Sequence, residues 1–299
     1  MKKYDITLLT ESRYENPKNK NWYIKNIIKE DYLVQKHLED LGLNVTRKDW
    51  NNAEFKWEDT KYALFRTTWD YFDKFKKFTK WLKKTKNKTE FINPYEQIMW
   101  NTDKHYLLEL SKKNIKIPPT KIITKNTKID LQEIFTQSNF KEIIIKPTVS
   151  GAGRHTYRIN KSNINKYKNI FSLLIKEEDF IVQEFQKNIL TKGEISIMLI
   201  NGKHTHAILK KAKKNEFRVQ DDFGGKVYSY SASKEEIKFA ENIISVIKPK
   251  PVYARVDLIF NDKNEIVLSE LELIEPEMWF RKNPLAAELL AKKIFEIYF

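Results

Sequence analysis

An acidic hairpin near the end of the chain is the feature that most constrains its fold. The segment PVYARVDLIFNDKNEIVLSELELIEP, residues 251–276, contains two apolar runs joined by NDKN, a turn-rich tetrapeptide that suits a β-hairpin. Successive residues of a strand point to opposite faces, so Glu270 and Glu272 share one face while Leu271 and Leu273 share the other. The second strand is therefore expected to have one apolar face and one anionic face.

The first strand of the hairpin adds a third carboxylate. Asp257 is flanked by Val256 and Leu258, so its side chain also points away from the apolar face. If the strands pair, Asp257, Glu270 and Glu272 gather on one patch. Carboxylates packed together repel one another unless a proton or a cation intervenes, and Mg²⁺ prefers such oxygen ligands. A solvated acidic face is the alternative for a pair of glutamates taken alone.

Composition places the chain among globular proteins. Its 299 residues can bury one large domain or two to three small ones, and 41% of them are hydrophobic and 13% aromatic. No apolar run reaches the roughly 18 residues of a membrane helix, and MKKYDITLLT reads as a first strand. A cytoplasmic protein without a membrane partner is expected. The absence of cysteine excludes disulfides, thiolate metal sites and a cysteine nucleophile.

The net charge of +15 raises the question of a nucleic-acid partner. The lysines are spread along the chain, which is also rich in Ile and Asn, so a general drift in composition explains most of the charge. A basic surface for a small polyanionic ligand is the alternative. Nucleic acid is not expected as a partner.

The order of elements predicts an α/β region followed by an α+β region. Strands and amphipathic helices alternate over the first ninety-odd residues, as in a Rossmann-like parallel sheet, with Gly42 ending the first helix, which is expected over residues 27–42. No G-x-G-x-x-G follows the first strand, so no dinucleotide is implied. A helix capped near residues 101–103 comes next. Strands then dominate from Thr120, including one over FRVQ, with helices at 163–176, 234–247 and 283–298.

A glycine-containing turn follows the strand EIIIKP. Lys146 lies near the end of that strand, and Gly151 and Gly153 lie in the turn, where backbone N–H groups can approach phosphate oxygens. The turn is not a Walker A loop, which would continue as G-K-S/T into a helix. Lys104 begins a helix further upstream. Taken alone, each lysine is more typical of ordinary surface structure.

Five further places in the sequence have the chemistry of ligand contacts. The strand end at residues 183–185 can present its backbone to an adenine, and Glu194, beside a turn, can accept ribose hydroxyls. Lys210 and Arg218 flank KKAKKNE and can clamp a phosphate or a carboxylate. Arg66, at a strand end in RTTWDYF, lies where open parallel sheets bind ligands, with a structural Trp69-Asp70 anchor as the alternative.

In order, these features resemble the ATP-grasp ligases over roughly residues 95–299. The motifs RTTWDYF, NPYEQIMWNTDKHYL, KPTVSGAGRHTYRI, GEISIMLINGKHTHAILK, FRVQDDFGG and YARVDLIF…LSELELIEPEMWF are more closely similar to the subfamily that contains the cycloserine-forming ligase, related to bacterial glutathione synthetases. The resemblance implies an ATP-grasp fold: a Rossmann-like domain at 1–95, a central subdomain at 96–185 and a C-terminal subdomain with the metal site at 186–299.

The resemblance also implies the activity. It indicates an ATP-dependent carboxylate–amine ligase that activates a carboxylate as an acyl phosphate and joins it to a nitrogen nucleophile of a small amino-acid or peptide-like substrate. A homodimer is the oligomeric state that it suggests. A nucleotide-binding module without turnover and a small-molecule phosphotransferase are the alternatives.

Residue roles follow from the same resemblance. The nucleotide would be held by Lys104 and Lys146 at the α- and β-phosphates, by the loop residues Ser150, Gly151, Gly153 and Arg154 over the β- and γ-phosphates, by Gln183, Glu184 and Phe185 at the adenine, and by Glu194 at the ribose. Asp257, Glu270 and Glu272 would ligate two Mg²⁺ ions, with Mn²⁺ as a substitute. Many such ligases have Asn at the position of Glu272. The substrate carboxylate or the acyl-phosphate charge would be met by Arg218, Arg255 and Lys210, while Glu275 and Glu277 flank the metal ligands.

Overall fold

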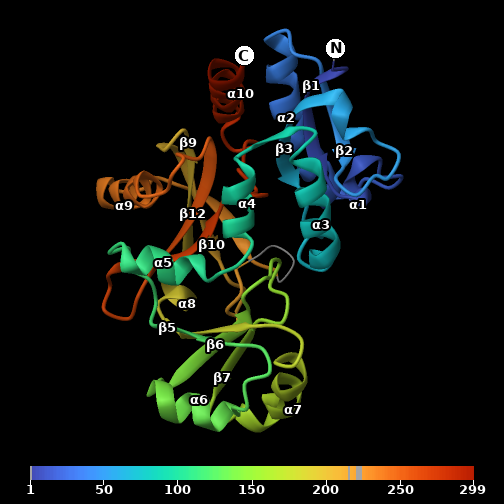
Figure 1. Ribbon diagram of the computed structural model, residues 1–299. Helices are drawn as coiled ribbons and strands as arrows, with labels where there is room; N and C mark the ends of the chain where they lie inside the picture. The colour runs from blue at the N-terminus through green and yellow to red at the C-terminus, as the bar shows by residue number, and fades with distance from the viewer. Residues whose placement is uncertain (1, 215, 220–223) are drawn as a thin grey trace.

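A parallel sheet forms the N-terminal part of the computed structural model, which describes residues 2–214, 216–219 and 224–299 (Figure 1). Its strand order is β2-β1-β3-β4, and every pairing is parallel. The strands are β1 (Tyr4–Thr10), β2 (Val45–Asp49), β3 (Thr60–Thr67) and β4 (Glu90–Ile92). The predicted Rossmann-like start of the chain is thus confirmed.

Helices α1 (Ser12–Glu15), α2 (Trp22–Asp40) and α3 (Phe75–Thr85) and the short 3-10 helix η1 (Trp57–Asp59) belong to this part. Helix α2 begins five residues before its expected start, because the Asn21 side chain accepts the N–H of Ile24 and caps it there. It ends at Asp40, two residues before the expected Gly42, whose φ of +84° lies in the left-handed region typical of a glycine after a helix.

The second sheet is antiparallel, in the order β5-β8-β6-β7. Its strands are β5 (Thr120–Ile123), β6 (Glu142–Pro147), β7 (Tyr157–Asn160) and β8 (Phe180–Glu184), and helices α6 (Leu131–Ser138) and α7 (Ile164–Leu174) pack on one face in a shared core. Helix α6 was not predicted. Its signal is a capping box, in which Asp130 and Glu133 each accept the other's backbone N–H.

The third sheet contains the acidic hairpin. Its order is β11-β10-β9-β12-β13, all antiparallel, with strands β9 (Glu194–Ile200), β10 (Lys203–Lys211), β11 (Lys226–Tyr230), β12 (Tyr253–Phe260) and β13 (Ile266–Glu272). Asp257 pairs with Glu270, and Arg255 pairs with Glu272. Paired residues of antiparallel strands share a face, so the predicted gathering of Asp257, Glu270 and Glu272 is confirmed. The strand expected over FRVQ is wrong for residues 217–219, and residue 220 lies outside the described residues.

The connection between the first two sheets differs from its prediction. Instead of one helix starting near residue 101, α4 (Tyr95–Asn101) begins directly after Pro94, and α5 (Tyr106–Lys112) follows it. Proline fixes φ at a value suited to a helix start, a signal that the prediction assigned to a turn. The buried Asn101 side chain donates to Leu271 O (2.9 Å) and accepts from the Leu273 N–H (2.7 Å). These bonds fix the end of the acidic strand against α4.

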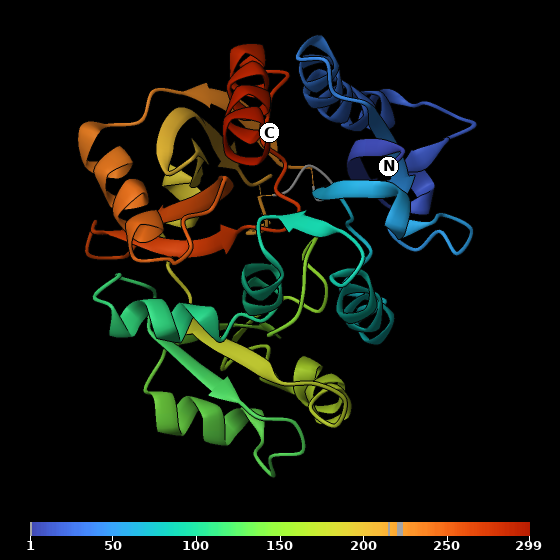
Figure 2. The same cartoon turned by 45° about the horizontal axis from the view of Figure 1, so that its top comes forward.

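The parallel sheet and the third sheet share one hydrophobic core. Helix α10 (Pro284–Tyr298) packs along α2, and the core runs from β1 and α2 to β9 and α10 (Figures 1 and 2). Helix α9 (Lys234–Ser245) covers the third sheet beside α5, and the short α8 (Ile189–Lys192) precedes β9. Within the described part of the chain, no helix has both the length and the apolar composition needed to cross a membrane.

Candidate active site

A cleft of about 210 Å³ opens between the second and third sheets. Its lining includes every residue predicted for the site except Arg154: Lys104, Lys146, Ser150, Gly151, Gly153, Gln183, Glu184, Phe185, Glu194, Lys210, Arg218, Arg255, Asp257, Glu270 and Glu272. These residues come from strands β6, β8, β9, β10, β12 and β13, from the loops beside them and, for Lys104, from the connection between α4 and α5. The fold therefore brings together positions that lie up to 168 residues apart in the chain.

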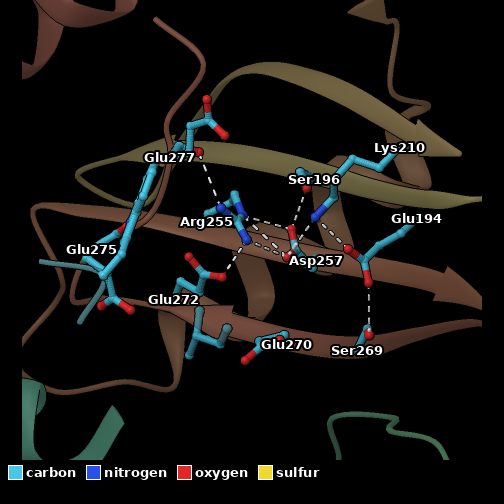
Figure 3. A network of polar contacts seen from close by, with 12 residues as sticks. Glu194, Ser196, Lys210, Arg255, Asp257, Ser269, Glu270, Glu272, Glu275 and Glu277 are labelled. Atoms are coloured by element: carbon cyan, nitrogen blue, oxygen red, sulfur yellow. Dashed lines mark hydrogen bonds and ion pairs between the residues drawn. The ribbon is translucent and has the colours of Figure 1, made fainter. Parts of the chain in front are cut away.

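Asp257 is the centre of the polar network in Figure 3. One carboxylate oxygen accepts from Ser196 Oγ (2.5 Å) and Arg255 Nε (3.0 Å), and the other from Arg255 Nη2 (2.9 Å) and Lys210 Nζ (3.2 Å). The side chain is 2% exposed. Burial alone would raise the pKa of Asp257, but Arg255 and Lys210 hold that pKa well below its ordinary range. Asp257 is thus an anion with four donors around it.

Lys210 joins this network to the predicted ribose contact. Its Nζ lies 2.5 Å from Glu194 Oε1, and Ser269 Oγ donates to the other Glu194 oxygen at 3.2 Å (Figure 3). Burial raises the pKa of Glu194. Burial opposes a charged Lys210, but Asp257 and Glu194 raise its pKa overall. Burial therefore disfavours the Glu194 anion, while the two carboxylates favour the charged form of Lys210.

Two lysines lie at the other end of the cleft. Lys104 Nζ is 3.1 Å from Glu270 and donates to Ser150 O at 2.6 Å, so it ties the acidic strand to the glycine loop. Burial works against the Glu270 anion, yet Lys104 and Lys146 lower its pKa. Burial also lowers the pKa of Lys146. Two lysines beside one carboxylate are the kind of groups that a polyphosphate would pair with.

The carboxylates differ in how well they fit a divalent cation. Glu270 and Glu272 lie two residues apart on the cleft face, retain side-chain exposures of 27% and 25%, and each has one cationic partner, Lys104 and Arg255 respectively. Asp257 is surrounded by its four donors instead. Among the described residues, no three His, Cys, Asp or Glu side chains are grouped so that they could hold a metal ion. Hard oxygen donors suit Mg²⁺ at Glu270 and Glu272, whereas an ion could reach Asp257 only if Arg255 or Lys210 moved aside.

Arg154 is the predicted residue that the fold directs elsewhere. Its guanidinium forms a double hydrogen bond with Glu178 (Nη2 to Oε1, 2.8 Å; Nη1 to Oε2, 3.0 Å) and lies 3.5 Å from Asp73. Gly151 and Gly153 stay at the cleft, and a Cβ on Gly151 would lie only 2.5 Å from the Phe72 ring. The loop thus lies at the first cleft but directs its arginine away from it.

The end of β8 is partly engaged in the sheet. The N–H of Glu184 donates to Pro119 O and that of Phe185 donates to Glu142 O, both at 2.9 Å. An adenine would therefore meet carbonyl groups and the Phe185 ring rather than these two N–H groups. The Arg158 guanidinium lies 4.0 Å from the centre of that ring. Arg218 lines the cleft and pairs with Glu216 at 2.7 Å.

A second cleft, of about 500 Å³, adjoins the first. Both are lined by Gly151, Ala152, Lys210, Arg255, Glu272 and Glu275. Besides Phe72, the aromatic residues that line it are Tyr14, Tyr23, Trp69 and Trp279. These four residues were not predicted as site residues. The available signal was only that Tyr14 follows the first strand closely and that Trp279 follows the acidic strand.

Arg66, a predicted substrate contact, is buried and lines neither cleft. It is 1% exposed, lies 3.5 Å from Asp31, and places its guanidinium 5.2 Å from the Phe280 ring centre. The anchor interpretation of the neighbouring dipeptide agrees with the contacts: Trp69 Nε1 donates to Glu275 O at 2.9 Å, and Asp70 accepts from Trp50 Nε1 at 2.7 Å.

The models of two protein families match parts of this chain. Residues 104–271 match the prokaryotic glutathione synthetase ATP-grasp domain, and residues 6–93 match the N-terminal domain of D-cycloserine synthetase DcsG. The first match covers more than half of the chain, so the protein belongs to the prokaryotic glutathione synthetase ATP-grasp family. It is an ATP-grasp ligase, which confirms the predicted enzyme class, fold class and use of ATP.

Among individual proteins, the cycloserine biosynthesis protein DcsG of Streptomyces lavendulae is similar, with 21% identity over 80% of this chain and 83% of its own. The crystal structure of D-cycloserine synthetase DcsG superimposes with a TM-score of 0.85 at 19% identity, covering 97% of this chain and 98% of that one. The D-alanine–D-alanine ligase of Bacillus anthracis complexed with ATP gives 0.62 at 15% identity, covering 98% and 96%. The ATP-grasp ligase PsnB, complexed with a precursor peptide and AMPPNP, gives 0.61 at 12% identity, covering 98% of each chain.

Proposed function

We propose that this protein phosphorylates a substrate carboxylate with ATP and joins the resulting acyl phosphate to a nitrogen nucleophile of a small amino-acid or peptide-like molecule. The observation that carries the proposal is the junction of the two clefts. Lys210, Arg255 and Glu272 line both of them, so a phosphate at the end of the first cleft faces a group entering from the second.

Nucleotide binding is assigned to the first cleft. Lys104 and Lys146 supply cations to the phosphates, the loop at 150–153 supplies backbone N–H groups, and Phe185 with neighbouring carbonyls meets the adenine. Glu194 would bind the ribose once Lys210 turns toward the reacting groups. Glu270 and Glu272 would hold Mg²⁺, which neutralises phosphate charge when bound. Two ions, the substitution of Mn²⁺ and a role for Asp257 as a ligand stay predictions.

The chemical step needs charge neutralisation more than covalent catalysis. A carboxylate oxygen attacks the γ-phosphorus of ATP, and the bond to the β-phosphate oxygen breaks to release ADP. The nitrogen then attacks the acyl carbon, loses a proton, and displaces inorganic phosphate. Arg255 and Lys210, buried at the junction, would stabilise the charge on the transferring phosphoryl group. They are held in place by Asp257, which contacts both.

The test is ADP release by the purified protein with Mg-ATP and a panel of amino acids and dipeptides, compared with Glu270→Gln. Acceptor-dependent ADP should fall by about a hundred-fold or more in this variant, because an anionic ligand for the Mg²⁺ that neutralises the phosphates is lost. Glu265→Gln is the matched control, since Glu265 lies in the same hairpin but is exposed and pairs with Lys116. Its rate should be unchanged.

Product analysis by mass spectrometry separates the alternatives. A new C–N bond supports the ligase, and a released phosphorylated acceptor supports the phosphotransferase. Tight ATP binding without ADP release on any acceptor would contradict the proposal and favour the binding module. The domain division at 1–95, 96–185 and 186–299, the cytoplasmic location and the homodimer also stay predictions.

A further inference from the structure

The second cleft contains one carboxylate that differs from the others. Glu275 lines both clefts and is 9% exposed. Its backbone oxygen is bonded to Trp69 and its own backbone N–H donates to its side chain, but among residues 2–214, 216–219 and 224–299 no ion pair reaches that side chain. A buried carboxylate without a cationic partner is costly, so such a group favours a ligand that can donate to it.

The other charged side chains that line this cleft are paired. Each cation that lines it already has an anionic partner: Arg13 has Glu11, Arg154 has Glu178, Lys210 has Glu194 and Asp257, and Arg255 has Asp257 and Glu272. Glu277 is likewise paired, with Arg281 at 2.5 Å. Of the acidic residues buried in the cleft wall, Glu275 alone lacks a cation within the described ranges. Burial and the nearby Glu272 hold the pKa of Glu275 well above its ordinary range, and a cation bound beside it would lower that pKa and restore the anion.

The surroundings of Glu275 suit an organic cation. Trp69 is fixed next to it by the hydrogen bond to Glu275 O, and the Tyr14 ring meets the Trp69 ring edge-on at 5.9 Å. Trp279 lines the same cleft, with the Arg281 guanidinium 4.2 Å from its ring centre. Aromatic faces attract ammonium groups by about 0.5–2 kcal/mol, and a nearby carboxylate adds a charge-assisted hydrogen bond.

We infer that the second cleft binds the ammonium group of a zwitterionic, amino-acid-like substrate at Glu275 beside Trp69. The inference rests on the proposed function and specifies its substrate class. The ammonium site lies in the wall that leads to Arg255 and Lys210, so one molecule can place its amine on Glu275 and its carboxylate at the junction. A substrate without a free amine would leave Glu275 unpaired and would bind more weakly.

The test uses calorimetric titration of the full chain, preloaded with AMPPNP and Mg²⁺. The ligands are the D- and L-forms of alanine, serine and glutamate, each compared with its N-acetyl derivative, so the first comparison needs no variant. Wild-type protein should bind at least one free amino acid about ten-fold or more tightly than its acetylated form. Glu275→Gln should abolish this preference and leave AMPPNP affinity within about two-fold of the wild type.

Glu277→Gln is the matched control, because Glu277 lines the same cleft but is paired with Arg281; it should keep most of the preference. Equal binding of free and acetylated ligands, or no binding of any free amino acid, would overturn the inference. So would loss of AMPPNP or Mg²⁺ binding in Glu275→Gln, which would place this residue in the nucleotide site. ADP release in the wild type is measured separately, so failure here with turnover intact leaves the ligase proposal standing.

Discussion

The two adjoining clefts differ in how their acidic side chains are paired with cations. In the nucleotide cleft, acidic and basic side chains alternate: Asp257 lies between Arg255 and Lys210, and Glu270 lies beside Lys104. In the second cleft, aromatic rings lie beside the charged side chains, and Glu275 has no ionic partner among the described residues. The first cleft therefore has the charges to hold a ligand that brings both phosphates and cations, while the second has a place for one positive group.

This difference also separates the part of the site that handles ATP from the part that is expected to select the substrate. The compensated network is compatible with any ligase that handles ATP, because it contacts the reacting charges and not the rest of the substrate. The aromatic cleft is formed by residues near the first strand, by Trp69 and by the segment after the acidic strand. Selectivity for the acceptor is expected to lie there.

The largest expected effect comes from breaking the network with Arg255→Met. Arg255 is buried and pairs with both Asp257 and Glu272, so its loss leaves two carboxylates uncompensated. Breaking a buried ion pair costs about 3–5 kcal/mol. The free energy of unfolding, measured with urea in EDTA, should fall by about this amount.

Arg255→Met combined with Asp257→Asn provides the control. Removing the charge of Asp257 should recover part of the lost stability, because one buried anion disappears with its partner. A single variant that unfolds within about 1 kcal/mol of the wild type would show that the network is not the compensated cluster described here.

Much of this first cleft could be predicted from sequence. The alternation of Glu270 and Leu271 and the turn-rich NDKN fix the face and pairing of the hairpin, since strand periodicity is local. What alternation cannot give is the partner of each carboxylate. Arg255 bonds Asp257 two residues away on its own strand, whereas Lys104 reaches Glu270 across 166 residues of chain. These contacts depend on tertiary placement.

The next effect concerns the wall of the second cleft. His206 Nε2 donates to Met278 O (2.9 Å), next to Trp279, and its other nitrogen accepts from Thr205 Oγ1 (2.9 Å), so the neutral ring satisfies both. Burial lowers the pKa of His206 to about 4 from 6.5. The unfolded chain binds the proton first, so this stabilisation is full above pH 6.5 and is lost as the pH falls toward 4.

The measurement is the unfolding free energy of the wild type and of His206→Gln between pH 7 and pH 4. The wild type should exceed the variant by about 1–2 kcal/mol at neutral pH, and the gap should close as the pH falls. Other titrating groups affect both proteins and cancel in the difference. A gap that stays constant with pH would mean that His206 does not hold this wall through its neutral form.

The second cleft was much less predictable. The motif RTTWDYF indicated either a substrate contact or an anchor, and the structure shows the anchor, with Trp69 bonded to Glu275 O across 206 residues. Tyr14 and Trp279 reach the cleft because α10 packs along α2 and joins the two ends of the chain. No periodicity in the sequence encodes that docking. The helix α6, in contrast, was missed despite a readable capping box.

The smallest expected effect concerns Arg154, in the glycine loop that lines both clefts. Arg154 was predicted to close over the phosphates, but its guanidinium is bonded to Glu178 at about one-quarter exposure of each side chain. A partly exposed ion pair contributes at most about 1 kcal/mol to stability. Because the Arg154 guanidinium is bonded to Glu178, Arg154→Gln should change ATP affinity by less than about three-fold in calorimetric titration.

Glu178→Gln supplies the counterpart to that variant, because it frees Arg154 without removing it. If Glu178 merely holds the arginine aside, releasing it should leave ATP affinity unchanged or raise it slightly, since a free guanidinium can then reach phosphate oxygens. A loss of ten-fold or more in Arg154→Gln would instead mean that the loop turns on binding nucleotide and carries Arg154 from Glu178 to the phosphates. In that case, the loop rather than the junction residues would separate the open and closed forms of the nucleotide cleft.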